Sequence, residues 1–132
     1  MSINLTVQEA IVAKNTCEFL KQKTFSAKVS FKLIKLLKEL EVIKNSFEEA
    51  KNATILRYGK KDDEGQIIKE ETEDGKIFIP IASENIEICN KELLETLEQK
   101  VEISDIYFYI KDFEEEKISP EELIGLFPFI LE

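Results

Sequence analysis

The stretch 26–59, SAKVSFKLIKLLKELEVIKNSFEEAKNATILRYG, decides the fold of this chain. Apolar residues recur in it at spacings of four and three, the periodicity of one buried helix face. Ser26 suits the N-cap of such a helix, and Gly59 suits its end. The stretch therefore predicts one long helix with an apolar seam, formed by Val29, Leu33, Leu36, Leu40, Ile43, Phe47 and Ala50.

The first half of this helix is apolar on a second face as well. Phe31, Ile34 and Leu37 lie away from the seam. A helix that is apolar on two faces is expected to be buried on both. We expect these three residues, together with Phe129 and Ile130 of the apolar C-terminal run, to form a protein interface. Either the C-terminal half of the chain or another copy can cover this face, and we slightly prefer another chain.

A shorter helix precedes the long one. Thr6 and Glu9 have the spacing of a capping box, in which each side chain satisfies the backbone of the other. The helix is predicted to run to residue 21 or 22, and a short polar link then leads into the long helix. Its apolar face consists of Ala10, Ala13, Cys17 and Leu20.

The periodicity changes after Gly59. Stretches 66–71 and 76–81 read as two strands joined around Asp74-Gly75, a strong hairpin signal. A third helix is expected to begin at Ser83 or Asn85. Stretch 101–111 alternates and predicts a strand paired with the hairpin. The sequence Ser-Pro-Glu-Glu at 119–122 is a second capping box and predicts a short final helix, which Pro128 ends.

Together these elements predict an α+β fold: a long N-terminal helical hairpin followed by a small antiparallel β-sheet with two shorter helices. A chain of 132 residues is most simply one domain, 1–132. Within it, 1–59 is the predicted helical hairpin, which is basic, and 60–132 is the predicted α+β part, which is acidic.

The charge is split between the two ends of the chain. Residues 1–61 contain 12 Lys or Arg and 6 Asp or Glu, whereas residues 62–132 contain 6 and 21, for a net charge of −9. Such asymmetry indicates a polyanionic partner, a basic partner, or pairing of the two halves. The sequence leaves these three open.

A set of basic and aromatic residues is the candidate ligand site. Lysines on one helical face could contact phosphates, and the end of the long helix adds an arginine and a tyrosine. We expect a small anionic ligand, such as a nucleotide, to bind at Lys28, Lys32, Lys35, Arg57, Tyr58 and Lys60. A solvated helix flank is the alternative explanation of the lysines. Binding of duplex DNA is disfavoured, because the pI is 4.7 and the chain has a single arginine.

The composition argues against catalysis. The chain has no histidine, which excludes Ser-His-Asp and Cys-His mechanisms and removes the commonest metal ligand. Cys17 and Cys89 stand among apolar neighbours and are expected to be buried, reduced thiols. We therefore expect no enzyme activity, no metal and no cofactor. A hydrolase that acts through carboxylates remains a further hypothesis, although nothing selects a carboxylate pair.

No stretch has the roughly 18 apolar residues that a membrane-spanning helix needs. The N-terminus lacks the basic region and apolar run of a signal peptide. The expected location is a cytoplasm.

Three stretches carry a resemblance to a known family: 55–65 (ILRYGKKDDEG), 90–97 (NKELLETL) leading to 101–103 (VEI), and 118–130 (ISPEELIGLFPFI). They are similar to small proteins of tailed phages of Gram-positive bacteria, a family of unknown function. The resemblance implies a phage origin and action in the host bacterial cytoplasm or in the virion. It supplies no catalytic residues.

The sequence thus favours a non-enzymatic phage accessory protein that binds and neutralises a host component. It would act in counter-defence, either by sequestering an anionic nucleotide or by blocking a host protein. The alternative is a tail or head assembly factor. The expected partners are a second copy in a homo-oligomer, a host or phage protein, or a small anionic ligand.

Overall fold

The computed structural model describes residues 2–114 and 116–131, and the fold is α+β, as predicted. The helices are α1 (Val7–Leu20), α2 (Ala27–Tyr58), α3 (Ile86–Glu98) and α4 (Pro120–Gly125). The strands are β1 (Ser2–Thr6), β2 (Glu70–Glu71), β3 (Ile77–Phe78), β4 (Lys100–Ser104), β5 (Phe108–Tyr109) and β6 (Ile130–Leu131). Short 3₁₀ turns cover Ser83–Asn85, Ile110–Phe113 and Phe127–Phe129.

The chain forms two compact units. Unit 1 combines the N-terminal residues up to Ser46 with the C-terminal residues from Glu98, and unit 2 is Phe47–Leu97. The predicted division at residue 59 does not coincide with these units, because the boundary falls inside α2 and both chain ends belong to unit 1. Contacts between residues far apart in sequence, and not the change in charge, define the units.

The predicted helical hairpin forms the centre of unit 1. α1 begins at the capping box of Thr6 and Glu9, whose two reciprocal hydrogen bonds measure 2.9 and 3.1 Å. Ser26 caps α2 by accepting a hydrogen bond from the Val29 amide at 3.3 Å. The seam residues of the two helices meet in one core, which contains Ala10, Ala13, Cys17 and Leu20 of α1 with Val29, Leu33, Leu36 and Leu40 of α2.

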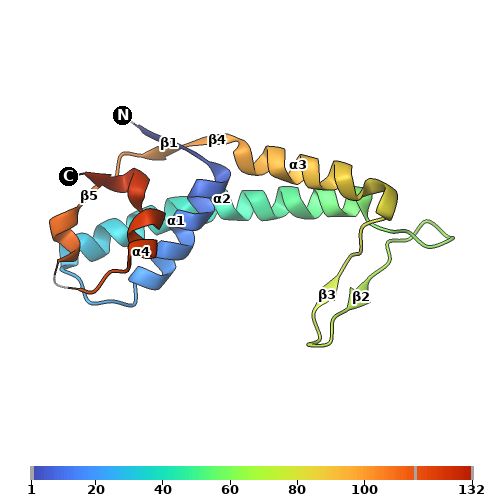
Figure 1. The fold of residues 1–132 in the computed structure, drawn as a ribbon, viewed down its shortest axis with the longest axis horizontal. Coiled ribbons are helices and arrows are strands. Elements are labelled where there is room, and N and C mark those ends of the chain that lie inside the picture. The colour runs from blue at the N-terminus through green and yellow to red at the C-terminus, as the bar shows by residue number, and fades with distance from the viewer. Residues whose placement is uncertain (1, 115, 132) are drawn as a thin grey trace. The chain divides into compact units, whose positions relative to one another are not determined.

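Strands from the two ends of the chain close this core. β1 pairs antiparallel with β4, with Ile3 opposite Ile103 and Leu5 opposite Val101 (Figure 1). β5 pairs in parallel with β6. The prediction of one strand over 101–111, paired with the hairpin, is therefore wrong in two respects. It is divided into β4 and β5, and its partners are β1 and β6, which supply an alternating apolar face and an apolar tail.

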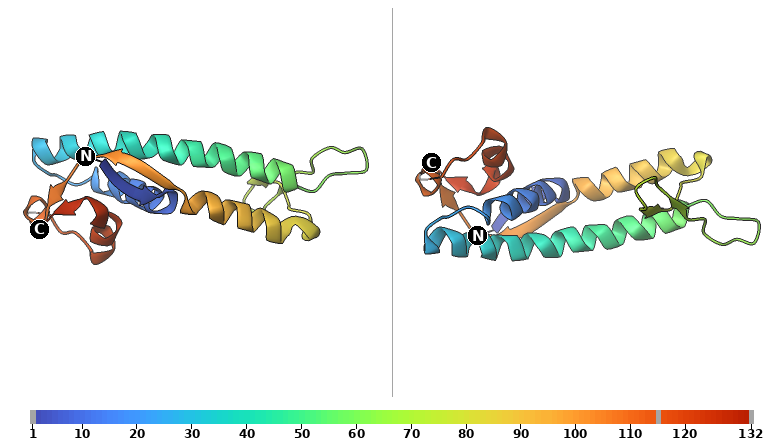
Figure 2. Two further views of the ribbon diagram at one scale, coloured as in Figure 1. Left: turned by 90° about the horizontal axis from the view of Figure 1, so that it is seen from above. Right: turned by 90° about the horizontal axis from the view of Figure 1, so that it is seen from below.

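Unit 2 consists of the last part of α2, the hairpin and α3. α3 runs beside this part of α2 (Figures 1 and 2). Tyr58 is the last residue of α2, and Gly59 follows it as predicted. A Cβ on Gly59 would lie 2.6 Å from Cγ2 of Ile79, so glycine allows the returning chain to pass close to the helix end.

The predicted hairpin is present in unit 2 but shorter than expected. β2 and β3 pair over only two positions each, Glu70 with Phe78 and Glu71 with Ile77. Gly75 occupies the turn with a φ of 86°, a conformation that favours glycine. The predicted third helix, α3, begins at Ile86 directly after the turn Ser83–Asn85, and no side-chain hydrogen bond caps this turn. No helix among the described residues is long and apolar enough to cross a membrane.

Candidate functional site

A groove between α1 and α4 is the main candidate site, and it lies entirely within unit 1. Two adjoining hollows, of about 400 and 390 Å³, share Val12 of α1. The first extends along α1 to Phe19, and the second extends from the end of α4 to Phe127 in the following 3₁₀ turn. We call the two hollows together the α1/α4 groove.

Four large apolar side chains of this groove face solvent. The exposed fractions are 47% for Val12, 56% for Phe19, 69% for Ile124 and 76% for Phe127. α1 already buries its other face in the core, and Gly125 is the buried residue of α4. Leu126 and Phe129 are buried directly beside Phe127. Apolar side chains that line one exposed groove make it a candidate binding surface.

The helix starts bring acidic residues to the rim of the groove. Its lining includes Glu9, Glu121 and Glu122, and no lysine or arginine of the described residues takes part in it. Oε1 of Glu122 accepts the Ser119 amide of the second capping box at 3.2 Å. Oε2 of Glu122 is buried, and no group among the described residues hydrogen bonds to it.

One close contact sets the shape of the groove. Gly125 of α4 packs against Thr16 of α1, and a Cβ on Gly125 would lie 2.0 Å from Oγ1 of Thr16. The Thr16 hydroxyl donates to the Val12 carbonyl at 3.1 Å, which fixes the side chain beneath the glycine. The glycine thus lets α4 lie directly on α1, with one hollow on each side of the contact.

The structure divides the predicted interface residues between surface and core. Phe31 and Ile34 are exposed, at 69% and 49%. Leu37 and Phe129 are buried in the core of unit 1, so this chain itself covers them, and Ile130 is half-buried beside them. Only Phe31 and Ile34 remain available to a partner.

The predicted lysine face is likewise divided. Lys28 and Lys35 are exposed on α2. Nζ of Lys32 instead donates to the Tyr107 carbonyl at 2.9 Å and lies 5.7 Å from the ring centres of Phe108 and Tyr109. Lys32 therefore holds the chain before β5 in place, and its amine is not free for a ligand.

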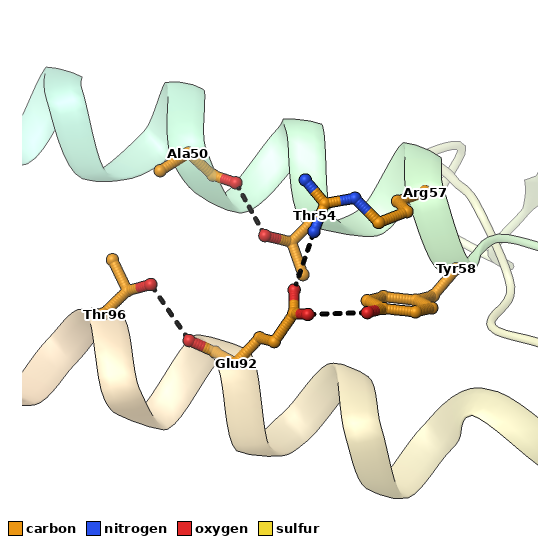
Figure 3. A network of polar contacts seen from close by, with 6 residues as sticks. All are labelled: Ala50, Thr54, Arg57, Tyr58, Glu92 and Thr96. Atoms are coloured by element: carbon orange, nitrogen blue, oxygen red, sulfur yellow. Dashed lines mark hydrogen bonds and ion pairs between the residues drawn. The ribbon is translucent and has the colours of Figure 1, made fainter.

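The other predicted ligand residues, Arg57, Tyr58 and Lys60, belong to unit 2. Figure 3 shows that Glu92 of α3 lies between Arg57 and Tyr58. Its carboxylate accepts from Nη1 of Arg57 at 3.1 Å and from the Tyr58 hydroxyl at 2.6 Å. The hydrogen bond to this carboxylate raises the pKa of Tyr58 above its ordinary value. These two donors thus join α2 to α3.

A further hollow, separate from the two of the α1/α4 groove, lies beside Arg57 in unit 2. Its volume is about 400 Å³, and its lining includes Arg57, Lys60 and Lys61. Ser83 and Glu84 line the same hollow. Three cationic side chains around one hollow suit an anion, although Glu92 already neutralises part of the Arg57 charge. Of the six predicted ligand residues, Lys28, Lys32 and Lys35 belong to unit 1, and Arg57, Tyr58 and Lys60 belong to unit 2.

Both cysteines are free and buried, as predicted. Burial is the main cause that raises the pKa of the Cys17 thiol to about 12, and the charge of Glu18 adds to it. Burial, followed by the charge of Glu92, also raises the pKa of Cys89. Neither thiol is prepared for nucleophilic chemistry.

Within the described residues, no group of three or more histidine, cysteine, aspartate or glutamate side chains is placed to hold a metal. Comparison with protein-family models, curated proteins and solved structures found no match. The resemblance to tailed-phage proteins stays a prediction.

Sequence reasoning missed the α1/α4 groove, although a signal was present. Val12, Thr16 and Phe19 repeat at helical spacing on a face of α1 different from its seam. Ile124 of α4 and Phe127 of the following 3₁₀ turn have a similar spacing of three. The signal is weak in so short a helix, because nothing in the sequence tells which of two apolar faces the core will take.

Proposed function

We propose that this chain is a non-catalytic binding protein that holds a basic, apolar segment of another protein chain in the α1/α4 groove. The observation that supports this proposal is the combination of four exposed apolar side chains with an acidic rim. Apolar contact supplies affinity in such sites, and charge complementarity selects the partner. An amphipathic helix with lysine or arginine beside its apolar face is the segment that fits best.

The biological setting of the proposal comes from the resemblance to tailed-phage proteins. In an infected bacterium, the bound segment would belong to a host protein, which is blocked as a result. The alternative is a phage protein that is held during tail or head assembly. In the first case the chain acts in the host cytoplasm, and in the second it enters the virion.

A synthetic leucine–lysine amphipathic peptide tests the proposed groove. We expect the labelled peptide to bind, as measured by fluorescence anisotropy, and its leucine–glutamate counterpart not to bind. Phe127→Glu should weaken binding at least about tenfold, since an exposed aromatic residue is a typical interface anchor.

A matched variant separates apolar contact from simple charge attraction. Ile77 of β3 is 71% exposed in unit 2, so Ile77→Glu adds the same charge outside the groove. A purely electrostatic attraction to this acidic protein would become stronger in both variants. Undiminished binding by the Phe127→Glu protein would contradict the proposal.

A second candidate function is supported by the cationic hollow of unit 2. Here the chain would hold a small anionic ligand, such as a nucleotide, beside Lys60 and Lys61. Calorimetric titration with ATP tests this function. Lys60→Glu with Lys61→Glu should abolish binding, whereas Lys28→Glu with Lys35→Glu, the same charge change on unit 1, should leave it unchanged. Equal loss in both double variants would argue against a site in unit 2.

A further inference from the structure

One face of α2 within unit 1 has the chemistry that the α1/α4 groove would accept. Phe31, Ile34 and Val42 are exposed on this face, and the exposed fraction of Val42 is 66%. Lys35 and Lys38 lie between them along the chain and are also exposed. The spacing 31, 34, 35, 38 and 42 places all five on one side of the helix. We call these five residues, with Lys28 at their N-terminal end, the α2 stripe.

The stripe and the groove are complementary in charge. The stripe has three lysines, Lys28, Lys35 and Lys38, and among the described residues none of them forms an ion pair. Among the residues that the structure describes, the groove lining has three glutamates and no basic residue. Both surfaces have large apolar side chains at their centres. The stripe is therefore a basic amphipathic helix face of the kind proposed above as the occupant of the groove.

The two surfaces do not cover each other within one copy. Phe31 of the stripe and Phe127 of the groove are both mostly exposed in the same chain. Both surfaces belong to unit 1, where α1, α2 and the segment around α4 share one core. A second copy can supply the missing partner surface without any rearrangement of that core.

We infer that the chain associates with itself head to tail, with the α2 stripe of one copy seated in the α1/α4 groove of the next. This inference rests on the proposed function, because it names an occupant of the same groove. Two different surfaces meet in such a contact, so a pair of copies leaves one groove and one stripe free. Association of this type continues into a ring or a filament and does not stop at a dimer. It favours the assembly role over the blocking of a host protein.

Complementing variants test the inference directly. Phe127→Glu disrupts binding by the groove and leaves the stripe intact, whereas Phe31→Glu disrupts the stripe and leaves the groove intact. In sedimentation experiments the wild-type protein should grow beyond a dimer as its concentration rises. Each variant alone should be a monomer. An equimolar mixture should form a dimer that grows no further, because one intact groove then meets one intact stripe.

Two controls keep the result interpretable. Circular dichroism verifies that the variants are folded, and the milder pair Ile124→Gln and Val42→Gln should show the same complementation. Ile77→Glu should associate like the wild type. The leucine–lysine peptide should dissociate the wild-type assemblies by occupying the groove.

Several results would overturn the inference. A wild-type protein that stays monomeric while its groove binds the peptide would contradict self-association and leave the proposed function standing. Association that survives Phe127→Glu would place the contact elsewhere. A mixture of the two variants that stays monomeric would exclude the head-to-tail arrangement, because that arrangement needs only one intact groove and one intact stripe.

Discussion

Unit 1 and unit 2 share helix α2, yet they bury very different amounts of apolar surface. Every residue of the main apolar core belongs to unit 1. Among the described residues of unit 2, only Thr54, Gly59 and Cys89 are buried. In unit 1, helices and strands from both chain ends surround the seam of α2. In unit 2, α3 runs beside α2 (Figure 1), and the strands of the hairpin are exposed. An apolar seam is buried only where enough elements pack on it.

The two units also differ in the contacts that join their helices. α1 and α2 meet through apolar side chains around Cys17 and Leu36. α2 and α3 are joined by the carboxylate of Glu92, which accepts from Arg57 and Tyr58. Apolar packing contributes more stability than exposed polar contacts do. The stability of the fold should therefore reside mainly in unit 1.

Two leucine truncations on α2 should show the largest difference between the units. Leu36 is fully buried in unit 1, whereas Leu56 in unit 2 is 49% exposed. Leu36→Ala should lower the free energy of unfolding by about 2–5 kcal/mol, because it leaves a cavity in the core. Leu56→Ala should change it by less than about 0.5 kcal/mol. Urea denaturation followed by circular dichroism measures both, and equal losses would contradict the assignment of the core to unit 1.

The contact of α4 with α1 tests a smaller part of unit 1. Gly125→Ala should destabilise the protein by about 1–3 kcal/mol, because the new methyl group overlaps the Thr16 hydroxyl. The same variant should weaken peptide binding to the groove. Adding Thr16→Ala should restore part of the loss, since it removes the nearest atom. A Gly125→Ala protein as stable as the wild type would show that α4 does not pack closely on α1.

The Cys17 thiol makes the free energy of unfolding depend on pH. Its pKa is about 12 in the folded protein, against an ordinary value of 9.0. Between these values the unfolded chain binds fewer protons, so the free energy of unfolding should fall as pH rises, by up to about 1.4 kcal/mol per pH unit. Below pH 9 the thiol is protonated in both states and this effect is absent.

Cys17→Ala should make this fall in stability less steep. The measurement compares urea denaturation of the wild type and the variant at about pH 8 and about pH 10. The difference in stability between the two proteins should shrink at the higher pH by about 1 kcal/mol. An identical difference at both values would mean that Cys17 is not shielded by the core.

The smallest expected effect concerns the polar contact of unit 2. Glu92→Gln should lower the pKa of Tyr58 toward its ordinary value, because the acceptor of the phenol proton loses its charge. Absorbance titration of the tyrosinate follows the change, and Tyr58→Phe identifies the tyrosine that responds. An unaltered titration curve would show that Glu92 and Tyr58 are not hydrogen bonded.

Helix boundaries were largely predictable from the sequence, because they depend on local chemistry. The capping boxes of Thr6 and Ser119, the end of α2 before Gly59 and the turn at Gly75 all follow from neighbouring residues. Strand pairing depends on segments far apart in sequence. Ile3 and Leu5 alternate with polar residues and could have predicted β1, but its partner β4 lies about a hundred residues away.

The candidate site was less predictable than the fold, for a related reason. Lys28, Lys32 and Lys35 share a helix face in the sequence, yet only the structure shows that the Tyr107 carbonyl binds Lys32. The sequence alone could not tell that Phe127 would be exposed and Phe129 buried, because both are phenylalanines in the same apolar run. Which side chains stay at the surface is decided by the packing of whole elements.

Mapping the bound leucine–lysine peptide by NMR tests the central claim most directly, namely that the α1/α4 groove of unit 1 is the binding surface. The account predicts that amide shifts concentrate in α1 and α4, around Val12, Phe19 and Phe127, while the amides of unit 2 stay in place. Shifts centred on unit 2 instead, or spread evenly over all acidic segments, would contradict it.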